Sequence, residues 1–243
     1  MPERALTLMS AGLFGKLPAK RDFIGMNASR RFLEAWEPWL QAGVAMSKQM
    51  LGDGWIDTYN RAPIWRYWLG ADFCGEAMIG AFMPSVDGVG RSFPLAIFVG
   101  EGDASLAPPE LEPNDAWFEA AEAVLLDALE PGATLERIAE KVGALPAPAV
   151  EPRTIKDGAL EELAGGGVLA RGVDNEVSAA FFAARRFGRR RAFASQTFWW
   201  TIGGEGFPSL GLLEVGLPPA TRFADMLTGA FSDGAAAALD DAT

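Results

Sequence analysis

Histidine is absent from this chain of 243 residues. A serine or cysteine nucleophile that depends on an imidazole base therefore cannot be built. A zinc ion would also lack its usual nitrogen ligands. Any catalysis would have to come from aspartate, glutamate, lysine or tyrosine side chains, or from a metal ion held entirely by oxygen atoms. The composition thus excludes several of the commonest kinds of active site.

Cysteine and long apolar runs are scarce as well. Cys74 is the only cysteine, so no internal disulfide can form, and a reducing compartment fits. Its neighbour Phe73, with no positive charge adjacent, predicts a buried thiol and not a nucleophile. Ser10 and Gly12 interrupt the short apolar stretch near the N-terminus, which therefore lacks the run of a signal peptide. No stretch approaches the roughly 20 apolar residues of a membrane span. We expect a cytoplasmic protein that does not insert directly into a membrane.

Positive charge is outnumbered, and the imbalance is local. The chain carries a formal net charge of -11. The segment from Glu101 to Glu162 holds 15 acidic and 4 basic residues, while the rest holds 17 of each sign. An anionic polymer would be repelled on average, so we expect no nucleic-acid partner. The acidic segment is either a solvated helical face, which is the more frequent case, or a docking surface.

Apolar residues at helical spacing predict several helices. Phe32 and Trp36 belong to such a stripe, which Asn27 or Ser29 can cap with a side-chain oxygen. Pro38 lies inside the stripe and predicts a kink or a break. Helices are expected at about 29–51, 114–130 with Asn114 as the cap, 134–143, 160–164, 176–186 and 220–231.

Apolar runs of strand length alternate with these helices. We expect strands at about 6–14, 64–72, 76–83 and 93–99, and a late hairpin from 197–202 and 209–215. The 93–99 run is apolar throughout, which is typical of a central strand. The neighbouring runs at 64–72, 76–83 and 93–99 favour an antiparallel meander. This order predicts an α/β protein with a sheet covered by helices.

Length and composition favour one domain. A chain of this size that is 49% hydrophobic can bury one substantial core. We expect a single domain over 1–233. Three prolines in 143–152 predict a linker or extended loop there. The alanine-rich end, 234–243, is expected to be a disordered tail.

The segment Pro84–Arg91 is the first candidate site. Its glycines allow backbone N–H groups to approach a ligand, and Asp87 and Arg91 could pair with each other or bind. The spacing is neither that of a phosphate-binding loop nor that of a dinucleotide-binding turn. The competing interpretation is a tight loop with a structural ion pair. The candidate residues are Ser85, Asp87, Gly88, Gly90 and Arg91.

Two other segments combine polar and aromatic residues. Lys16 is followed by Asp22, and the simplest interpretation of this segment is an ordered turn. Trp65 and Arg66 belong to an aromatic strand. Tryptophan beside arginine is common at binding hot spots, although aromatic residues in a strand more often belong to the core.

An arginine cluster lies late in the chain. Clustered guanidinium groups can hold phosphate or carboxylate groups of a partner, or can neutralise the acidic segment of the same chain. Nearby, the adjacent Trp199 and Trp200 are expected to point to opposite faces of a strand. The cluster consists of Arg185, Arg186, Arg189, Arg190 and Arg191.

Together these segments resemble the TagF/ImpM family of proteins associated with the bacterial type VI secretion system. The order and spacing of the motifs agree, and the resemblance is strongest over residues 12–100. A late block, Phe198–Thr201, is also similar. One departure is Arg21, which stands where the family usually has glycine before Asp22. The motifs are Gly12–Pro18, Asp22–Phe23, Trp36–Gln41, Ala62–Tyr67 and Pro84–Leu95.

The resemblance implies a three-layer α/β/α sandwich with a central, largely antiparallel or mixed sheet. It also implies a cytoplasmic post-translational repressor of type VI secretion that binds the forkhead-associated scaffold protein of that system. It supplies no catalytic residues, metal ligands or cofactor, so we expect none and no enzymatic activity. Some relatives continue into a serine/threonine phosphatase domain, for which this chain is expected to be too short.

Two alternatives remain open from the residues. One is a small-ligand sensor or hydrolase centred on Asp87 and Arg91, which would require Lys16 and Arg66 to converge with them in an enclosed polar pocket. The other is a nucleic-acid adaptor, which would require the arginine cluster to lie on one exposed face. Internal ion pairs at the motif residues would favour the protein-binding regulator.

Overall fold

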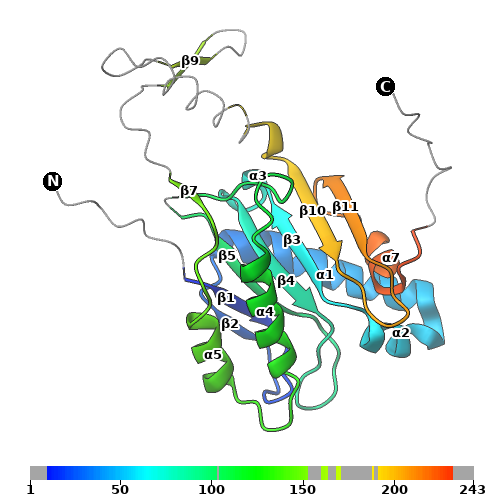
Figure 1. Ribbon diagram of the computed structural model, residues 1–243. Coiled ribbons are helices and arrows are strands. Elements are labelled where there is room, and N and C mark those ends of the chain that lie inside the picture. The colour runs from blue at the N-terminus through cyan, green and yellow to red at the C-terminus, as the bar shows by residue number, and fades with distance from the viewer. Residues whose placement is uncertain are drawn as a thin grey trace.

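The computed structural model describes residues 10–102, 104–152, 160–163, 168–170, 188 and 191–231. Its main feature is a seven-stranded sheet in the order β11-β10-β3-β4-β5-β1-β2, in which every neighbouring pair is antiparallel (Figure 1). The strands are β1 (Gly12–Gly15), β2 (Ile24–Met26), β3 (Trp65–Leu69), β4 (Met78–Met83), β5 (Leu95–Gly100), β10 (Gln196–Thr201) and β11 (Leu210–Val215). The expected meander of β3, β4 and β5 and the late hairpin are confirmed.

The 93–99 run is an interior strand. It forms β5, which pairs with β4 on one side and with β1 on the other. All six residues of β5 are buried. Because both faces of the strand are covered, its side chains need no polar alternation. The continuous apolar run that predicted a central strand has this cause.

Helices contact both faces of the sheet (Figure 1). On one face lie α1 (Arg30–Leu51), the single 3₁₀ turn η1 (Gly52–Gly54), α2 (Trp55–Arg61) and α7 (Arg222–Thr228). On the other lie α4 (Asp115–Asp127) and α5 (Leu135–Gly143). The short α3 (Ala71–Cys74) follows β3. The chain is therefore α/β, as its alternating apolar patterns predicted.

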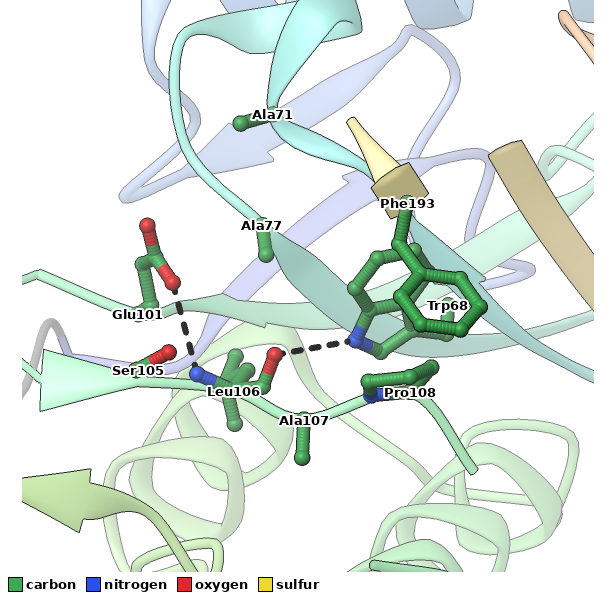
Figure 2. Close-up of a pocket in the computed structure, with 9 residues that line it drawn as sticks. All are labelled: Trp68, Ala71, Ala77, Glu101, Ser105, Leu106, Ala107, Pro108 and Phe193. Atoms are coloured by element: carbon green, nitrogen blue, oxygen red, sulfur yellow. Dashed lines mark hydrogen bonds between the residues drawn. The ribbon is translucent and has the colours of Figure 1, made fainter. Parts of the chain in front are cut away.

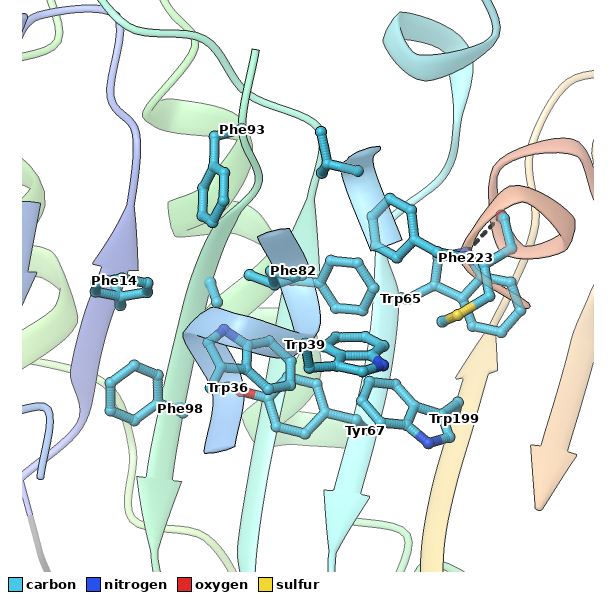
Figure 3. Packing of buried hydrophobic residues seen from close by; sticks show 14 of the residues in the cluster. Phe14, Trp36, Trp39, Trp65, Tyr67, Phe82, Phe93, Phe98, Trp199 and Phe223 are labelled. Atoms are coloured by element: carbon cyan, nitrogen blue, oxygen red, sulfur yellow. Dashed lines mark hydrogen bonds between the residues drawn. The ribbon is translucent and has the colours of Figure 1, made fainter. Parts of the chain in front are cut away.

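The helix α1 supplies most of one core. Its N-cap is Ser29, whose hydroxyl accepts a hydrogen bond from the Phe32 N–H at 3.1 Å. The helix continues through Pro38, so a break there, one of the two outcomes predicted from the sequence, does not occur. Figure 3 shows Trp36 and Trp39 of α1 against Trp199 of β10. This stripe of tryptophans fixes α1 across the sheet.

The second core lies beneath α4 and α5. Trp117, Phe118 and Leu125 of α4 are buried against this face of the sheet. Asn114 occupies the N-cap position, but its side chain does not bond the helix. Its Oδ1 instead accepts the Ala149 N–H at 2.6 Å. This bond ties the proline-rich segment 143–152 back to the domain. That segment ends in β7 (Glu151–Pro152), which pairs with β6 (Ala104–Ser105).

Several local predictions need correction. The helix expected at 160–164 is wrong, because Leu160–Glu162 forms strand β8 and pairs with β9 (Val168–Ala170). Strand β3 ends at Leu69, earlier than expected, and α7 is shorter than 220–231. Gly229, with φ of 73°, ends α7 because only glycine adopts this conformation readily. The helix expected at 176–186 and the tail at 234–243 lie outside the described residues.

Candidate functional site

The loop after β4 is a closed hairpin. Val86 and Ser92 form a β-bridge, and the Phe93 N–H donates to the Ser85 carbonyl at 3.0 Å. Inside this frame the Asp87 N–H donates to the Arg91 carbonyl at 3.1 Å. These two backbone bonds close the loop, and the Asp87 side chain points inward with 0% exposure.

Both oxygens of Asp87 are occupied. Oδ2 lies 3.0 Å from the Lys16 Nζ and 2.7 Å from the Arg91 Nε. Oδ1 accepts the N–H groups of Val89 at 3.1 Å and Arg91 at 2.9 Å. Lys16 is itself buried and also donates to the Arg91 carbonyl at 3.3 Å. This Lys16–Asp87–Arg91 cluster is an internal ion-pair network that locks the loop onto β1.

The environment keeps Asp87 ionised. Burial opposes ionisation, but hydrogen bonds from the Arg91 N–H and the side chains of Lys16 and Arg91 outweigh it, and the pKa of Asp87 falls well below its usual value. Four bonds to the carboxylate leave it poorly placed to accept a proton from a substrate. In this geometry the carboxylate joins Lys16, Val89 and Arg91.

The lowered pKa of Asp87 predicts acid sensitivity. The unfolded chain takes up the Asp87 proton near its ordinary pKa of about 4, while the folded chain does so only at lower pH. Stability from this group is therefore complete above that ordinary value and is lost as pH falls toward the folded pKa.

Urea unfolding from pH 7 to pH 3 should thus show a steeper loss of stability for the wild type than for Asp87→Asn. Below pH 4, the plots of unfolding free energy against pH should differ in slope by the equivalent of up to about one bound proton. Parallel slopes would show that Asp87 has an ordinary pKa in the folded chain.

Ser85 connects the loop to a helix and to the Lys16 segment. Its hydroxyl donates to the Lys16 carbonyl at 2.8 Å. Its N–H donates to the Tyr59 hydroxyl at 3.1 Å, and that hydroxyl donates to the Ser85 carbonyl at 3.2 Å. Burial raises the pKa of Tyr59, although the bond with Ser85 opposes this effect. Ser85 and Tyr59 therefore serve as buried supports of the loop.

The two loop glycines serve its closure. Gly90 has φ of 83°, a conformation that favours glycine. The Gly88 N–H donates to the Lys20 carbonyl at 2.7 Å, and a Cβ at Gly88 would lie 3.0 Å from the Pro18 carbonyl oxygen. A positive φ at Gly90 and close backbone packing at Gly88 thus account for the two glycines.

The Asp22 turn lies beside the loop. Asp22 is exposed, and its Oδ1 accepts the Phe23 N–H at 2.9 Å. The Arg21 carbonyl accepts a bond of 2.6 Å from the Arg91 Nη2. Arg21 does not have a positive φ, in keeping with a non-glycine residue at this position.

Trp65 and Arg66 are buried away from this cluster. The Trp65 Nε1 donates to the Met226 carbonyl at 3.0 Å. Arg66 binds both oxygens of Glu122 on α4, with its Nε 2.6 Å from Oε1 and its Nη2 3.0 Å from Oε2, and lies 3.4 Å from Asp115. Burial lowers the pKa of Arg66, but Glu122 and the nearby acids raise it above the ordinary value. Arg66 does not join Asp87 in a common pocket.

A family model now bears on these residues. The model that describes the N-terminal domain of TagF, type VI secretion system-associated, matches residues 12–145. The chain belongs to the TagF family. The match contains Lys16, Asp22, Trp65, Arg66 and the whole Pro84–Arg91 loop.

A solved structure resembles the whole chain. The crystal structure of PA0076 from Pseudomonas aeruginosa PAO1 is 32% identical in sequence and has a TM-score of 0.73. The similarity covers 92% of this chain and 96% of PA0076. A search of curated protein sequences found no match. The structural similarity extends well beyond the residues that the TagF model matches.

Most of the arginine cluster lies outside the residues that the structure describes. Arg185, Arg186, Arg189 and Arg190 lie outside the described residues. Arg191 is exposed, and residues 191–193 are helical shortly before β10. Its role in this TagF-family chain stays a prediction.

A small hollow lies at the other end of the sheet. Figure 2 shows Trp68 and Phe193 beside Leu106, whose N–H donates to Glu101 at 3.3 Å. The Trp68 Nε1 donates to the Leu106 carbonyl at 3.3 Å. The hollow spans about 330 Å³, including space open to solvent. Both hydrogen bonds join residues of its lining.

Two further observations limit the chemistry of the described residues. No group of three histidine, cysteine, aspartate or glutamate side chains is arranged there to hold a metal ion. No helix in that part of the chain has the length and apolar character needed to span a bilayer. Cys74 is buried, and desolvation raises the pKa of its thiol to about 12, which disfavours the reactive thiolate.

The sequence did not predict the partnership of Tyr59 with Ser85 or of Glu122 with Arg66. Neither stands near its partner in the chain: Tyr59 supports Ser85, and Glu122 binds Arg66. Glu122 belongs to the acidic segment from Glu101 to Glu162, which the sequence predicted to be a solvated helical face or a docking surface. Its place on the inward side of α4, one turn after the buried Phe118, was the available signal.

Proposed function

We propose that this chain is a post-translational repressor of type VI secretion that acts by binding another protein, without catalysis. Membership of the TagF family links the chain to that system. The observation that carries the proposal is the internal pairing of the charged family motifs. Lys16 and Arg91 pair with Asp87, and Arg66 pairs with Glu122. Pairing of this kind supports a role of these residues in holding the surface of the domain in shape.

The proposed target is the forkhead-associated scaffold protein of the secretion system. A repressor without catalytic power acts by mass action and occupies its target in proportion to concentration. The net charge of -11 favours a partner that presents positive charge, since complementary charge raises association rates. The five arginines from Arg185 to Arg191 are proposed as a second contact. The three-layer α/β/α arrangement and cytoplasmic location of the family are inferred for this chain as well.

The first test is made in cells. Overproduction should block secretion while leaving the levels of secretion components unchanged, and extra scaffold protein should relieve the block. A block that persists at high scaffold levels would contradict binding to the scaffold.

The same proposal is testable with purified proteins. Titration calorimetry should detect scaffold binding that weakens with added salt. An unrelated protein of similar net charge controls for nonspecific attraction. The purified chain should hydrolyse neither phosphoesters nor nucleotides. Turnover that Asp87→Asn abolishes would instead favour a hydrolase centred on the Asp87/Arg91 loop.

A further inference from the structure

An apolar groove opens beside the last hairpin of the sheet. It lies between the segment that precedes α4 and the exposed side of β10 and β11, and it spans about 680 Å³, including open solvent. Figure 1 shows β10 and β11 lying to the side of α4. The helix α4 contacts β4 and β5, so this part of the same sheet face extends past it. The lining includes Pro109, Pro113, Phe198, Trp200, Gly211 and Leu213.

The register of the hairpin produces the groove. Trp200 pairs with Gly211, and Phe198 pairs with Leu213, on the same face of the two strands. Gly211 has no side chain to fill the space opposite Trp200. A Cβ at Gly211 would meet no atom within 4 Å. The hollow therefore exists because Gly211, which has no side chain, stands opposite the large side chain of Trp200.

The edge of the sheet next to the groove is open within the described part of the chain. There β11 has β10 as its one strand neighbour. Its apolar residues Leu213 and Val215 are 58% and 80% exposed, and Ile202 at the hairpin tip is 64% exposed. An edge strand of this kind offers backbone N–H and C=O groups to an added strand.

One acidic residue lines the groove, and two more are next to its lining prolines in the chain. Asp115 lines it with a side chain that is 64% exposed. Glu110 is exposed and Glu112 partly exposed, and both stand between the two prolines of the lining. Leu111, between them, is 49% exposed. The groove thus has an apolar floor and, beside it, the exposed carboxylate of Asp115, which lies 3.4 Å from the buried Arg66. Asp115, Glu110 and Glu112 are called the negative rim.

The negative rim selects the occupant. A second copy of this chain carries the same net charge of -11, and like charges oppose association. A lysine or arginine would be attracted to the rim instead. Apolar side chains at every second position of an extended segment would fill the floor, because alternate residues of a strand face one side.

We propose that the groove and the β11 edge bind an extended segment of a partner protein, with apolar residues at alternate positions and lysine or arginine at its ends. The segment adds to β11 as a further strand. This inference deepens the proposed function and rests on it for the nature of the partner as a protein. The partner segment is recognised through main-chain pairing with β11, through apolar contacts with the floor of the groove, and through the attraction of its lysine or arginine to the negative rim.

The test uses a labelled synthetic peptide of about ten residues, a typical strand length, with valine at alternate positions, threonine between them and lysine at both ends. Fluorescence anisotropy should show binding to the full chain. Gly211→Val fills the hollow without a clash and suits a strand, so it should keep the wild-type melting temperature. It should weaken peptide binding by at least about ten-fold.

Leu213→Lys should weaken peptide binding similarly, because it places a positive charge in the apolar floor of the groove, where it repels the lysines of the peptide. Leu126→Lys is the matched control, since Leu126 is 56% exposed on α4 and does not line the groove. It should leave binding within about two-fold. A peptide with glutamate in place of lysine should bind at least about ten-fold more weakly.

Three results would overturn the proposal: no binding by the wild type, equal binding by Gly211→Val, or a wild-type dimer in sedimentation that Leu213→Lys dissolves. Titration with the forkhead-associated scaffold separates this proposal from the proposed function. Scaffold binding that survives Gly211→Val would rule out the groove as the binding site for the scaffold and would leave the proposed function intact. Peptide binding without scaffold binding would leave the groove intact and remove the proposed partner.

Discussion

Replacing Asp87 with alanine is expected to lower the melting temperature by about 10 °C. The substitution leaves Lys16 with a charge, a side chain of only 8% exposure and no carboxylate. It also removes the acceptor of two loop N–H groups, from Val89 and Arg91. Loss of one member of a buried ion pair is costly because the other charge stays desolvated. Differential scanning calorimetry at pH 7 measures the effect.

Glu34→Ala is the matched control for Asp87→Ala. It also removes one acid from an ion pair, here with Arg30, but both side chains are mostly exposed. Exposed pairs contribute little, so the melting temperature should change by no more than about 2 °C. An unchanged melting temperature in Asp87→Ala together with lost scaffold binding would show that the loop is a contact surface and not an internal support.

The second large effect is expected at Arg66. Arg66→Met should lower the free energy of unfolding by about 3 kcal/mol, because Glu122 would lose its bidentate partner while its side chain is only 14% exposed. The contact of the guanidinium with the Phe118 ring, 5.3 Å away, is also lost. Urea unfolding at pH 7 gives the free energy.

A double substitution separates charge from packing at this site. Arg66→Met with Glu122→Leu should recover most of the lost stability, since replacing both partners of a buried pair by apolar groups is often neutral. Asp115→Ala, which removes the exposed acid 3.4 Å from Arg66, should have a small effect. A double variant no more stable than Arg66→Met would show that packing of the guanidinium, not the stranded carboxylate, dominates.

The sequence by itself determined the elements whose signals are local. The apolar stripe of Phe32 and Trp36 predicted α1, and the apolar run at 93–99 predicted an interior strand; both follow from periodicity along a few turns or residues. The pairing of Asp87 with Arg91 was also predictable, because the two residues belong to one short loop. The absence of histidine excluded imidazole chemistry before any fold was known.

Predictions from the local sequence failed where residues with a weak conformational preference contact a distant segment of the chain. Residues 160–162 have the composition of a short helix, yet they form β8 because β9 offers a partner for their backbone. The Asn114 side chain, a good cap by type, bonds Ala149 instead of its helix. In both cases a contact with a distant segment outweighed the preference of the residue itself.

Tertiary structure alone decided the composition of the site. Lys16 reaches Asp87 because β1 pairs with β5, and Arg66 reaches Glu122 because α4 packs across the strands. The groove depends on register, since a shift of one residue would place another side chain opposite Trp200 and remove the hollow at Gly211. Ion-pair partners and hollows are set by which segments lie side by side, and residue order along the chain does not encode that adjacency.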